Sequence, residues 1–259
     1  MADSPSGYRE RNSTADRALA ILDLFTEARS VLTASQVSEH LGVARSTAYR
    51  YLQSLVQARY LTETVGGYSL GLKVLELARV ARKGLDVGRI SQPVMVQIAR
   101  EFGETVLLTR RVGDSIVCIE REEPEGQRLH VSYEPGTIMP INAGASAHVL
   151  LAWLPDEEVN SLLASRPLRA FTPNTLTDPK SLLERLHRIR ERGYALSVSE
   201  LDPEVLGVAA PIFDSSGTVR AAISMAGLTS RMDPNEYETI AARIVEAARG
   251  ISERLSLLD

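Results

Sequence analysis

The stretch from residue 33 to residue 55 constrains the fold of this 259-residue chain more than any other part. Thr33 and Gln36 have the spacing of a capping box, in which two side chains satisfy the free backbone N–H groups at a helix start. Gly42 can adopt the positive φ that ends such a helix and turns the chain. Beyond it, apolar residues recur at helical spacing from Ala48 to Val56. The stretch therefore predicts two helices joined by a short turn.

The polar face of the second helix carries residue types that read DNA. Arg45, Ser46, Tyr49 and Arg50 stand near its N-terminal end. Arginine can donate two hydrogen bonds to a guanine, while hydroxyl groups and a helix N-terminus meet phosphate. The alternative for the two arginines is solvated surface charge, and Thr47 could instead cap or buttress the turn. We expect a DNA-reading helix-turn-helix.

The flanking segments complete a winged helix-turn-helix. Residues 13–25 place Ala18, Ile21 and Phe25 on one face, which predicts the helix that closes a three-helix core. Residues 60–70 contain two β-rich runs around Gly66 and Gly67, a pair that permits the left-handed dihedrals of a two-residue hairpin turn. The expected domain covers residues 13–70. Its wing tip, at these two glycines, would lie against DNA.

The segments on either side of this domain are expected to be an arm and a linker. Residues 1–12 have no apolar core, so they are not a signal peptide, and we expect a disordered arm. Residues 71–87 are expected to be a linker helix. This helix could be a solvated linker or a dimer-forming helix. We favour dimerisation, because the small first domain could not cover the apolar stripe of this helix alone.

Charge is distributed unevenly along the chain, whose net charge is −4. Residues 1–85 hold 11 Lys and Arg against 8 Asp and Glu, whereas residues 86–259 hold 18 against 25. A mildly basic first module on an acidic remainder fits a specific DNA reader with a separate second domain.

The single cysteine, Cys118, excludes an internal disulfide and fits a reducing cytoplasm. The histidines lack ligand-spaced partners, so no metal site or cofactor is expected.

Residues 88–259 read as a mixed domain in which strands pair in hairpins. The turn signals are Gly113-Asp114 and residues 214–217. The expected strands are 105–112, 115–121, 129–133, 195–199, 205–213 and 218–227, and the expected helices are 93–102, 142–154, 155–164, 178–192 and 233–257. The fold class is therefore α+β, with an antiparallel sheet covered by helices.

Several short motifs, taken in order, carry a resemblance to a known family. They include Arg45–Leu52, Gly103–Val106, Met139–Ala143, Arg192–Tyr194 and Ala210–Phe213. Each string is weak, but their order and spacing, from about residue 13 to about residue 257, closely resemble the IclR family of bacterial transcription regulators. The resemblance implies a winged helix-turn-helix, a linker helix and a GAF-like effector domain.

The resemblance also implies partners and site residues. The protein would be a homodimer or homotetramer that binds a double-stranded DNA operator and senses a small organic or aromatic acid or related metabolite, with repression favoured over activation. Carried over by position, the DNA-binding residues would be Arg45, Ser46, Thr47, Tyr49, Arg50, Gly66 and Gly67. The effector-binding residues would be Val131, Ala145, Ser146, Ser197, Val205, Gly207, Ser224 and Ala226.

The chain departs from the family pattern around this pocket. Asn142 stands where the family usually has a histidine, and Ala147-His148 stands where it favours a glycine-lysine pair. Ala226 replaces a polar residue, and Ser197 replaces an acidic one. These changes make the pocket less polar and favour a larger or more apolar ligand.

The segment from Gly144 to His148 is the most enzyme-like part of the chain. It half-resembles a nucleophile elbow, but the second glycine is missing, and Ser146 and His148 would point to different helix faces. A helix start that binds an acidic ligand is the favoured interpretation, with His148 a structural or rim residue. No catalytic residue is expected. The alternatives are an enzyme that uses the first module for assembly, and a DNA-binding scaffold with a vestigial pocket.

Overall fold

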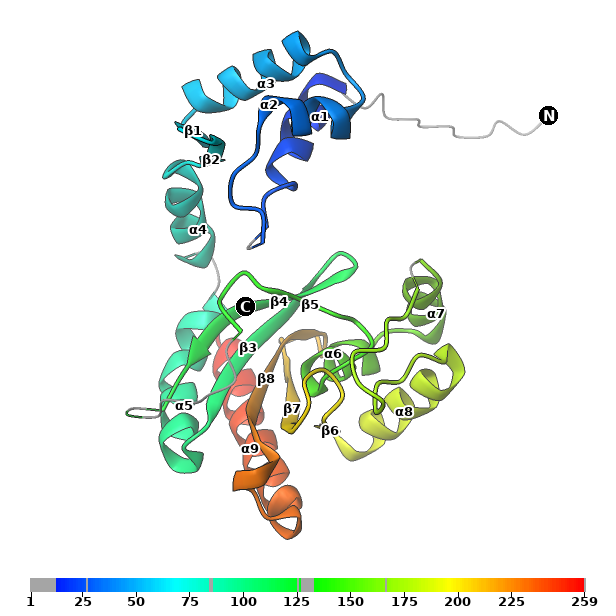
Figure 1. Ribbon diagram of the computed structural model, residues 1–259. Helices are drawn as coiled ribbons and strands as arrows, with labels where there is room; N and C mark the ends of the chain where they lie inside the picture. Colours follow the sequence, from blue (N-terminus) through cyan, green and yellow to red (C-terminus); the bar gives the residue numbers. More distant parts are fainter. Residues whose placement is uncertain are drawn as a thin grey trace, which may run out of the picture. The chain divides into compact units, whose positions relative to one another are not determined.

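The computed structural model describes residues 13–26, 28–83, 86–124, 126, 133–165 and 167–258 (Figure 1). Its contacts divide the chain into two compact units, residues 1–84 and 85–259. The arm expected at residues 1–12 lies outside the described residues. So does the expected strand at 129–133, except for Tyr133, which is in no strand. No helix in the described ranges is long and apolar enough to cross a membrane.

The N-terminal unit is a helical core with a hairpin. Its elements are α1 (Ser13–Leu22), α2 (Ala34–Leu41), α3 (Arg45–Gln57), β1 (Leu61–Thr64), β2 (Gly67–Leu70) and α4 (Lys73–Lys83). Ile21 of α1, Val37 of α2, Leu52 of α3 and Tyr68 of β2 are buried in one cluster. The first three helices and the hairpin thus contribute apolar faces to the same small core, as the helical and strand spacings predict, whereas α4 contributes no residue to it.

The boundaries of α2 follow local hydrogen bonds. The backbone N–H of Gln36 donates to Thr33 Oγ1 at 3.3 Å, and the backbone N–H of Thr33 donates to Gln36 Oε1 at 2.8 Å. Gly42 ends the helix with φ at 61°. The predicted capping box and glycine stop are confirmed.

The hairpin turn differs from the predicted one. Its two central residues are Val65 and Gly66, and Gly67 already pairs with Thr64 in the ladder. Gly67 has φ at 140°, and a Cβ there would stand 2.3 Å from the carbonyl oxygen of Leu32. Leu32 and Tyr68 exchange backbone hydrogen bonds of 2.9 and 2.8 Å. The prediction of a Gly66-Gly67 turn was wrong, because close packing of a distant segment, not the turn, requires Gly67.

The C-terminal unit contains an antiparallel sheet in the order β5-β4-β3-β8-β7-β6. The unit begins with α5 (Asp86–Phe102) and continues with β3 (Thr105–Val112), β4 (Ser115–Glu122), β5 (Ile138–Met139), α6 (Ala145–Ala152), α7 (Asp156–Ala164), α8 (Pro179–Arg192), β6 (Ala195–Val198), β7 (Val205–Phe213), β8 (Val219–Leu228) and α9 (Tyr237–Leu255). Two 3₁₀ turns, Thr229–Arg231 and Pro234–Glu236, precede α9. The predicted α+β class is confirmed.

Helices cover both faces of this sheet (Figure 1). Alternate strand residues point to opposite faces, so Val208 and Ile223 pack with α5 and α9. Ala209 and Ala222, one residue away, pack with α6, α7 and α8. This alternation decides which residues of β7 and β8 can face the start of α6.

The main differences from the sequence prediction in this unit concern α5, β5 and α6. Helix α5 begins at Asp86 and contains Pro93 in its interior, whereas the prediction began the helix at that proline, where proline is favoured. Strand β5 was missed, because two residues give no periodicity. Helix α6 begins at Ala145 rather than at residue 142.

Candidate functional site

The first candidate site is the exposed face of α3. Arg45, Ser46, Tyr49 and Arg50 are exposed, and Thr47 is half-buried. Neither arginine forms an ion pair with any residue that the structure describes, and no side chain caps the start of the helix at Ala44. The guanidinium groups and the first backbone N–H groups therefore keep their capacity to bind an external anion.

The hairpin is fixed to this helix. Gln53 Nε2 of α3 donates a hydrogen bond of 2.5 Å to Glu63 Oε1 of β1. Val65 and Gly66 form the exposed tip, while Gly67 is half-buried against Leu32. Of the two glycines predicted for the wing tip, only Gly66 is in the turn. Val65 is the tip residue that the sequence analysis missed.

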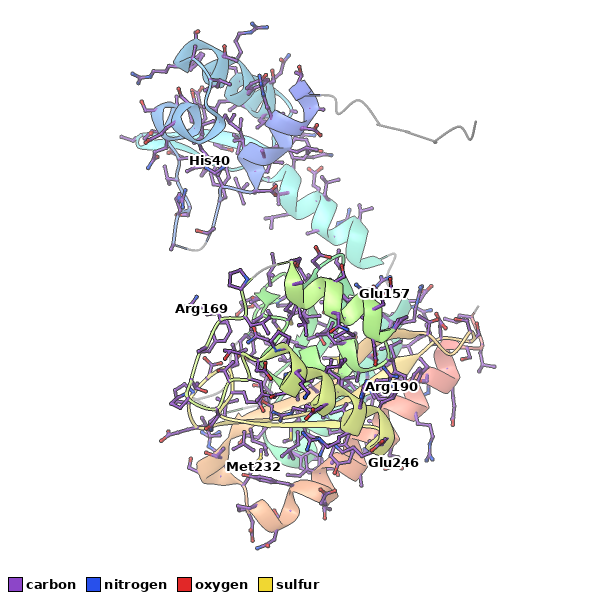
Figure 2. All side chains as sticks on the ribbon, turned by 90° about the vertical axis from the view of Figure 1, so that its right-hand side faces the viewer. His40, Glu157, Arg169, Arg190, Met232 and Glu246 are labelled. Atoms are coloured by element: carbon purple, nitrogen blue, oxygen red, sulfur yellow. The ribbon has the colours of Figure 1, made fainter. Side chains whose placement is uncertain are left out.

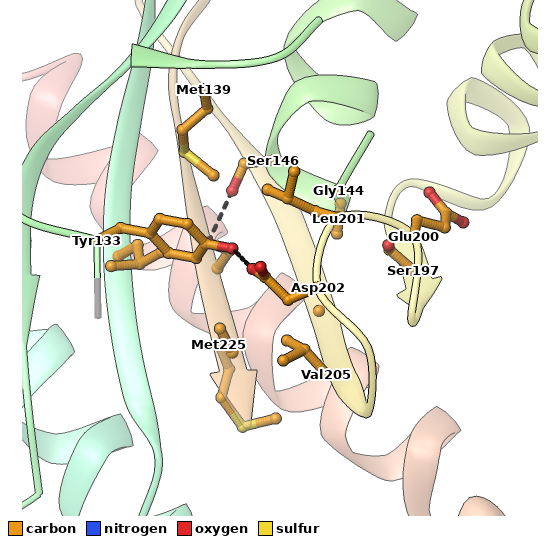
Figure 3. Close-up of a pocket in the computed structure, with 15 residues that line it drawn as sticks. Tyr133, Met139, Gly144, Ser146, Ser197, Glu200, Leu201, Asp202, Val205 and Met225 are labelled. Carbon is orange, nitrogen blue, oxygen red and sulfur yellow. Dashed lines mark hydrogen bonds between the residues drawn. The ribbon is translucent and has the colours of Figure 1, made fainter. Parts of the chain in front are cut away.

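The second candidate site is a cavity between the start of α6 and the sheet (Figure 3). Seven of the eight predicted effector residues line it: Ala145, Ser146, Ser197, Val205, Gly207, Ser224 and Ala226. Val131, the eighth, lies outside the described residues. The register pairs Gly207 with Ala226, which puts both on the α6 face of the sheet. A Cβ at Gly207 would stand 3.4 Å from Ala145 Cβ, so this position holds the helix start close to the strand.

Polar groups at the helix start face the cavity. Ser146 Oγ and Ser224 Oγ are hydrogen-bonded at 2.8 Å. Gly144, with φ at 89°, precedes the first turn of α6, and no side chain caps it. A helix start without a side-chain cap offers backbone N–H groups to a carboxylate or another anion.

Loop residues that sequence reasoning missed close the cavity. Tyr133, Leu201 and Asp202 line it, and the Tyr133 hydroxyl donates a hydrogen bond to Asp202 Oδ2. Burial, together with the negative charge of Asp202, raises the pKa of Tyr133 well above its usual value, so the hydroxyl keeps its proton. No periodicity in the sequence marks these residues. The acidic pair Glu200 and Asp202 after a predicted strand was the only available signal.

The cavity is small. Its volume is about 40 Å³, enough for roughly three water molecules. An aromatic acid needs more room, so the inference of a larger ligand from Asn142, Ser197 and Ala226 gains no support from the cavity as it stands. Asn142 does not line it. Its side-chain amide donates to the carbonyl groups of Arg169 and Leu176 at 3.0 and 2.9 Å instead.

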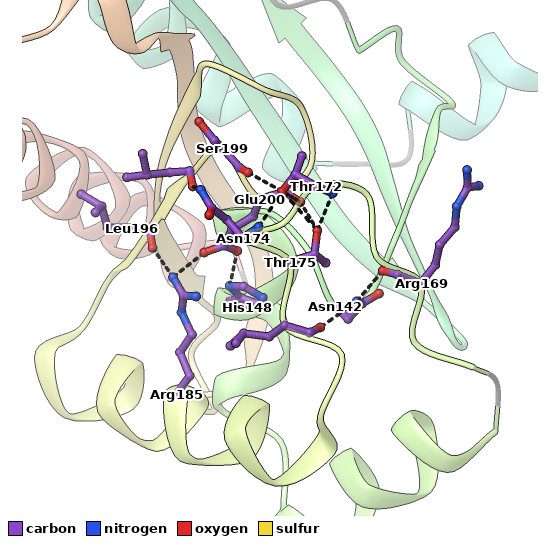
Figure 4. Close-up of polar contacts among 12 residues, drawn as sticks. Asn142, His148, Arg169, Thr172, Asn174, Thr175, Arg185, Leu196, Ser199 and Glu200 are labelled. Atoms are coloured by element: carbon purple, nitrogen blue, oxygen red, sulfur yellow. Dashed lines mark hydrogen bonds and ion pairs between the residues drawn. The ribbon is translucent and has the colours of Figure 1, made fainter.

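A buried charged network lies behind the cavity (Figure 4). Glu200 is only 3% exposed, and its Oε1 lies 2.6 Å from Arg185 Nη2 of α8. Arg185 also donates to the carbonyl group of Leu196 at 2.8 Å, and Thr175 Oγ1 donates to the carbonyl group of Glu200 at 2.6 Å. Burial raises the pKa of Glu200, and the charge of Arg185 opposes that shift.

His148 belongs to this network and not to the rim of the cavity. It is fully buried, and its Nδ1 lies 3.7 Å from Glu200 Oε2. Burial, and after it the positive charge of Arg185, lowers the pKa of His148 to about 3. The ring is therefore neutral at ordinary pH. Of the two predicted roles, the structural one agrees with this burial and the rim one does not. Ser146 is hydrogen-bonded to Ser224, not to His148.

Metal-ligating side chains do not gather within the described residues. No group of three or more His, Cys, Asp or Glu side chains there could hold a metal ion. His40 lies in the N-terminal unit (Figure 2). His187 Nε2 lies 2.8 Å from Asp156 Oδ2. Cys118 is buried, and its Sγ lies 3.5 Å from the carbonyl oxygen of Glu120 and 3.4 Å from that of Tyr133.

Comparisons with known proteins cover both units. Residues 14–64 match the IclR helix-turn-helix domain, and residues 80–253 match the C-terminal domain of bacterial IclR transcriptional regulators. The chain is 32% identical over 249 residues to the HTH-type transcriptional regulator KipR of Bacillus subtilis, covering 95% of this chain and 98% of that protein. It is 30% identical over 244 residues to the HTH-type transcriptional repressor AllR of Salmonella typhi, covering 93% and 89%.

A solved structure also resembles the chain. An IclR homologue from Microbacterium hydrocarbonoxydans, crystallised with 4-hydroxybenzoate, superimposes with a TM-score of 0.80 at 27% identity, covering 94% of this chain and 99% of that one.

We predict that His148 makes the C-terminal unit sensitive to acid. The unfolded chain takes up a proton at this position near pH 6.5, whereas the folded chain does so only near pH 3. Stability is therefore lost as the pH falls through this window, by up to about 1.4 kcal/mol per pH unit. The variant His148→Leu should lose this part of the slope. Urea unfolding followed by the fluorescence of Trp153, the single tryptophan, reports on this unit.

Two features keep this measurement specific. Glu200, with its raised pKa, acts in the opposite direction above pH 4.5, but it is present in both proteins. His40→Leu, in the other unit, serves as the matched control. An unchanged slope in His148→Leu would mean that the ring is accessible to protons in the folded state.

Proposed function

The chain belongs to the IclR family of bacterial transcription regulators, and from this premise we propose that α3 reads an operator while the cavity beside α6 senses a small organic or aromatic acid. The observation that carries the proposal is that seven of the predicted effector residues, which come from α6, β6, β7 and β8, line one cavity. We also propose that the protein represses its target genes in the absence of the matching ligand. It would act in the cytoplasm, where bacterial DNA lies.

The α3 surface supports the first half of the proposal. Arg45 and Arg50 are exposed and unpaired among the described residues, and the buried residues Ala48, Leu52 and Leu55 hold the opposite face of the helix. A helix supported in this way can enter the major groove as a rigid reader. The exposed turn at Val65 and Gly66 would lie on the sugar-phosphate backbone or in the minor groove, with Gly67 acting as its support.

The cavity supports the second half. The start of α6 offers backbone N–H groups, and Ser146 and Ser224 offer hydroxyl groups, which suits the carboxylate of an acid. The homologue from Microbacterium hydrocarbonoxydans binds 4-hydroxybenzoate, an acid of this class. An enzyme is the less favoured alternative, because Ser146 is hydrogen-bonded to Ser224 rather than to a base within the described ranges, and His148 is buried and neutral.

We propose that the protein is a dimer, or a dimer of dimers, that uses α4. Leu72, Leu75, Leu77 and Val80, in or next to this helix, are exposed in the single chain, and Leu75 is 66% exposed. A second copy that covers this apolar surface would remove it from water. Two α3 helices would then face successive turns of a pseudo-palindromic operator.

Replacing Arg50 with alanine should weaken specific operator binding by about 1–3 kcal/mol if the guanidinium group reads a base. The measurement is a binding isotherm, at several salt concentrations, on a fragment selected from genomic DNA. Base reading predicts a loss that depends on the sequence, while phosphate contact predicts a uniform loss and a shallower salt dependence. Arg188→Ala, an exposed site in α8 of the C-terminal unit, removes the same charge as a control. Unchanged affinity in Arg50→Ala would remove this residue from the reading surface.

Replacing Ser146 with leucine should abolish the ligand response and leave operator binding intact, because the larger side chain fills a cavity of about 40 Å³. The measurement is release of the operator fragment as a metabolite panel is titrated. Ser161→Leu, an exposed position in α7, controls for the substitution itself. A normal dose-response in Ser146→Leu would show that the ligand binds elsewhere.

Replacing Leu75 with glutamate should dissociate the assembly, because a charge would then have to be buried in the proposed interface. Sedimentation velocity would show a shift toward the monomer, accompanied by weaker operator binding. Lys73→Glu, a change on the same helix at a residue paired with Glu76, tests whether added negative charge alone has this effect. A Leu75→Glu protein that sediments like the wild type would place the interface elsewhere.

A further inference from the structure

Two loops meet over the cavity through one hydrogen bond. Tyr133 lies between β4 and β5, at one side of the sheet, and Asp202 lies between β6 and β7, at the other. Their side chains join above β3, β8 and β7, the strands that form the floor of the cavity (Figure 3). We call this pair, Tyr133 and Asp202, the clasp.

The loop that carries Asp202 has several hydrogen bonds at its base and one at its tip. Ser199 and Glu204, at its two ends, hold positive φ angles of 52° and 58°, and Ser199 Oγ accepts a hydrogen bond from the backbone N–H of Glu204. Thr172 Oγ1 donates to the carbonyl group of Ser199 at 2.6 Å. In the described part of the chain, the segment 201–203 is hydrogen-bonded to the rest only through the clasp. The clasp can therefore open without breaking other hydrogen bonds of the loop.

The space beneath the clasp is too small for the proposed ligand. A cavity of about 40 Å³ holds roughly three waters, so an acid of six or more heavy atoms enters only if the clasp opens. Opening leaves a half-buried carboxylate and a half-buried phenol without their partner. A buried polar group left unsatisfied costs free energy, so a ligand that restores both bonds is favoured.

The charges around the clasp limit which functional groups a ligand can place there. Glu200 and Asp202 both line the cavity, and no lysine, arginine or histidine does so among the described residues. Glu200 is already paired with Arg185, so Asp202 is the acidic group that an incoming ligand meets. A second carboxylate on the ligand would be repelled there. A hydroxyl or amino group can donate to Asp202, and a hydroxyl group can also accept from Tyr133.

We propose that the clasp determines specificity and selects an acid that carries a second, hydrogen-bond-donating group, a hydroxy or amino acid rather than a simple monocarboxylate or a dicarboxylate. The acid end would bind at the start of α6, and the donor group would take the place of Tyr133 beside Asp202. This inference rests on the proposed function, namely that the cavity is the effector site.

The test measures binding of two matched series to the full-length protein by calorimetry. One series is benzoate, 4-hydroxybenzoate and benzene-1,4-dicarboxylate, and the other is butyrate, 4-hydroxybutyrate and succinate. In at least one series, the wild type should bind the hydroxy acid at least about tenfold more tightly than its parent, and the dicarboxylate should be weakest. In Asp202→Asn the preference for the hydroxy acid should shrink and the dicarboxylate should gain affinity. Asp23→Asn, in the N-terminal unit, should change neither ratio.

The outcomes separate the two proposals. Equal affinity for parent and hydroxy acid, unchanged ratios in Asp202→Asn, or no binding by any member of either series would overturn the role of the clasp. Ser146→Leu provides the second comparison. Binding that is lost in Ser146→Leu while Asp202→Asn keeps the wild-type ratios overturns the clasp alone. Binding that survives Ser146→Leu places the ligand outside the cavity, and the proposed effector site fails with it.

Discussion

The buried carboxylate of Glu200 is the interaction on which the geometry of the cavity depends. It pairs with Arg185 of α8, which also donates to the carbonyl group of Leu196 in β6, and its second oxygen lies 3.7 Å from Nδ1 of His148 in α6. Because an unpaired buried carboxylate costs several kcal/mol, these three segments have to stay together once the protein folds. The start of α6, the edge of the sheet and the β6–β7 loop are thereby held around one small volume.

Elements governed by contacts within a few residues could be predicted from the sequence. The capping box of Thr33 and Gln36 and the glycine stop at Gly42 depend only on neighbours in the chain, and the structure contains both. The prediction of a turn at Gly66 and Gly67 was wrong because it depended on a contact outside the local sequence. Gly67 is required by the carbonyl oxygen of Leu32, a contact between segments far apart in the sequence that no local pattern reveals.

The residues of the cavity also fall into those that could be predicted and those that could not. Positions such as Gly207 and Ser224 were supplied by the family resemblance, and the register of the sheet places them on the face toward α6. Tyr133 and Asp202 could not be predicted, since they lie 69 residues apart in loops that have no periodicity. The sequence left two roles open for His148, structural or at the rim, because the neighbours that surround its ring and decide between them come from other elements. Family position therefore identifies the floor of such a pocket better than its cover.

A ligand can shift the protein between states only if it binds one state more tightly than the other. The sheet offers a short physical route by which such a difference can leave the cavity. Leu107 of β3 lines the cavity, while its neighbours Val106 and Leu108 face the opposite side and pack in the cluster that contains Met95 and Ile98 of α5. Close-packed layers transmit small displacements rather than absorb them. A ligand that opens the clasp and presses on β3 would therefore displace α5, the helix that follows α4 in the chain.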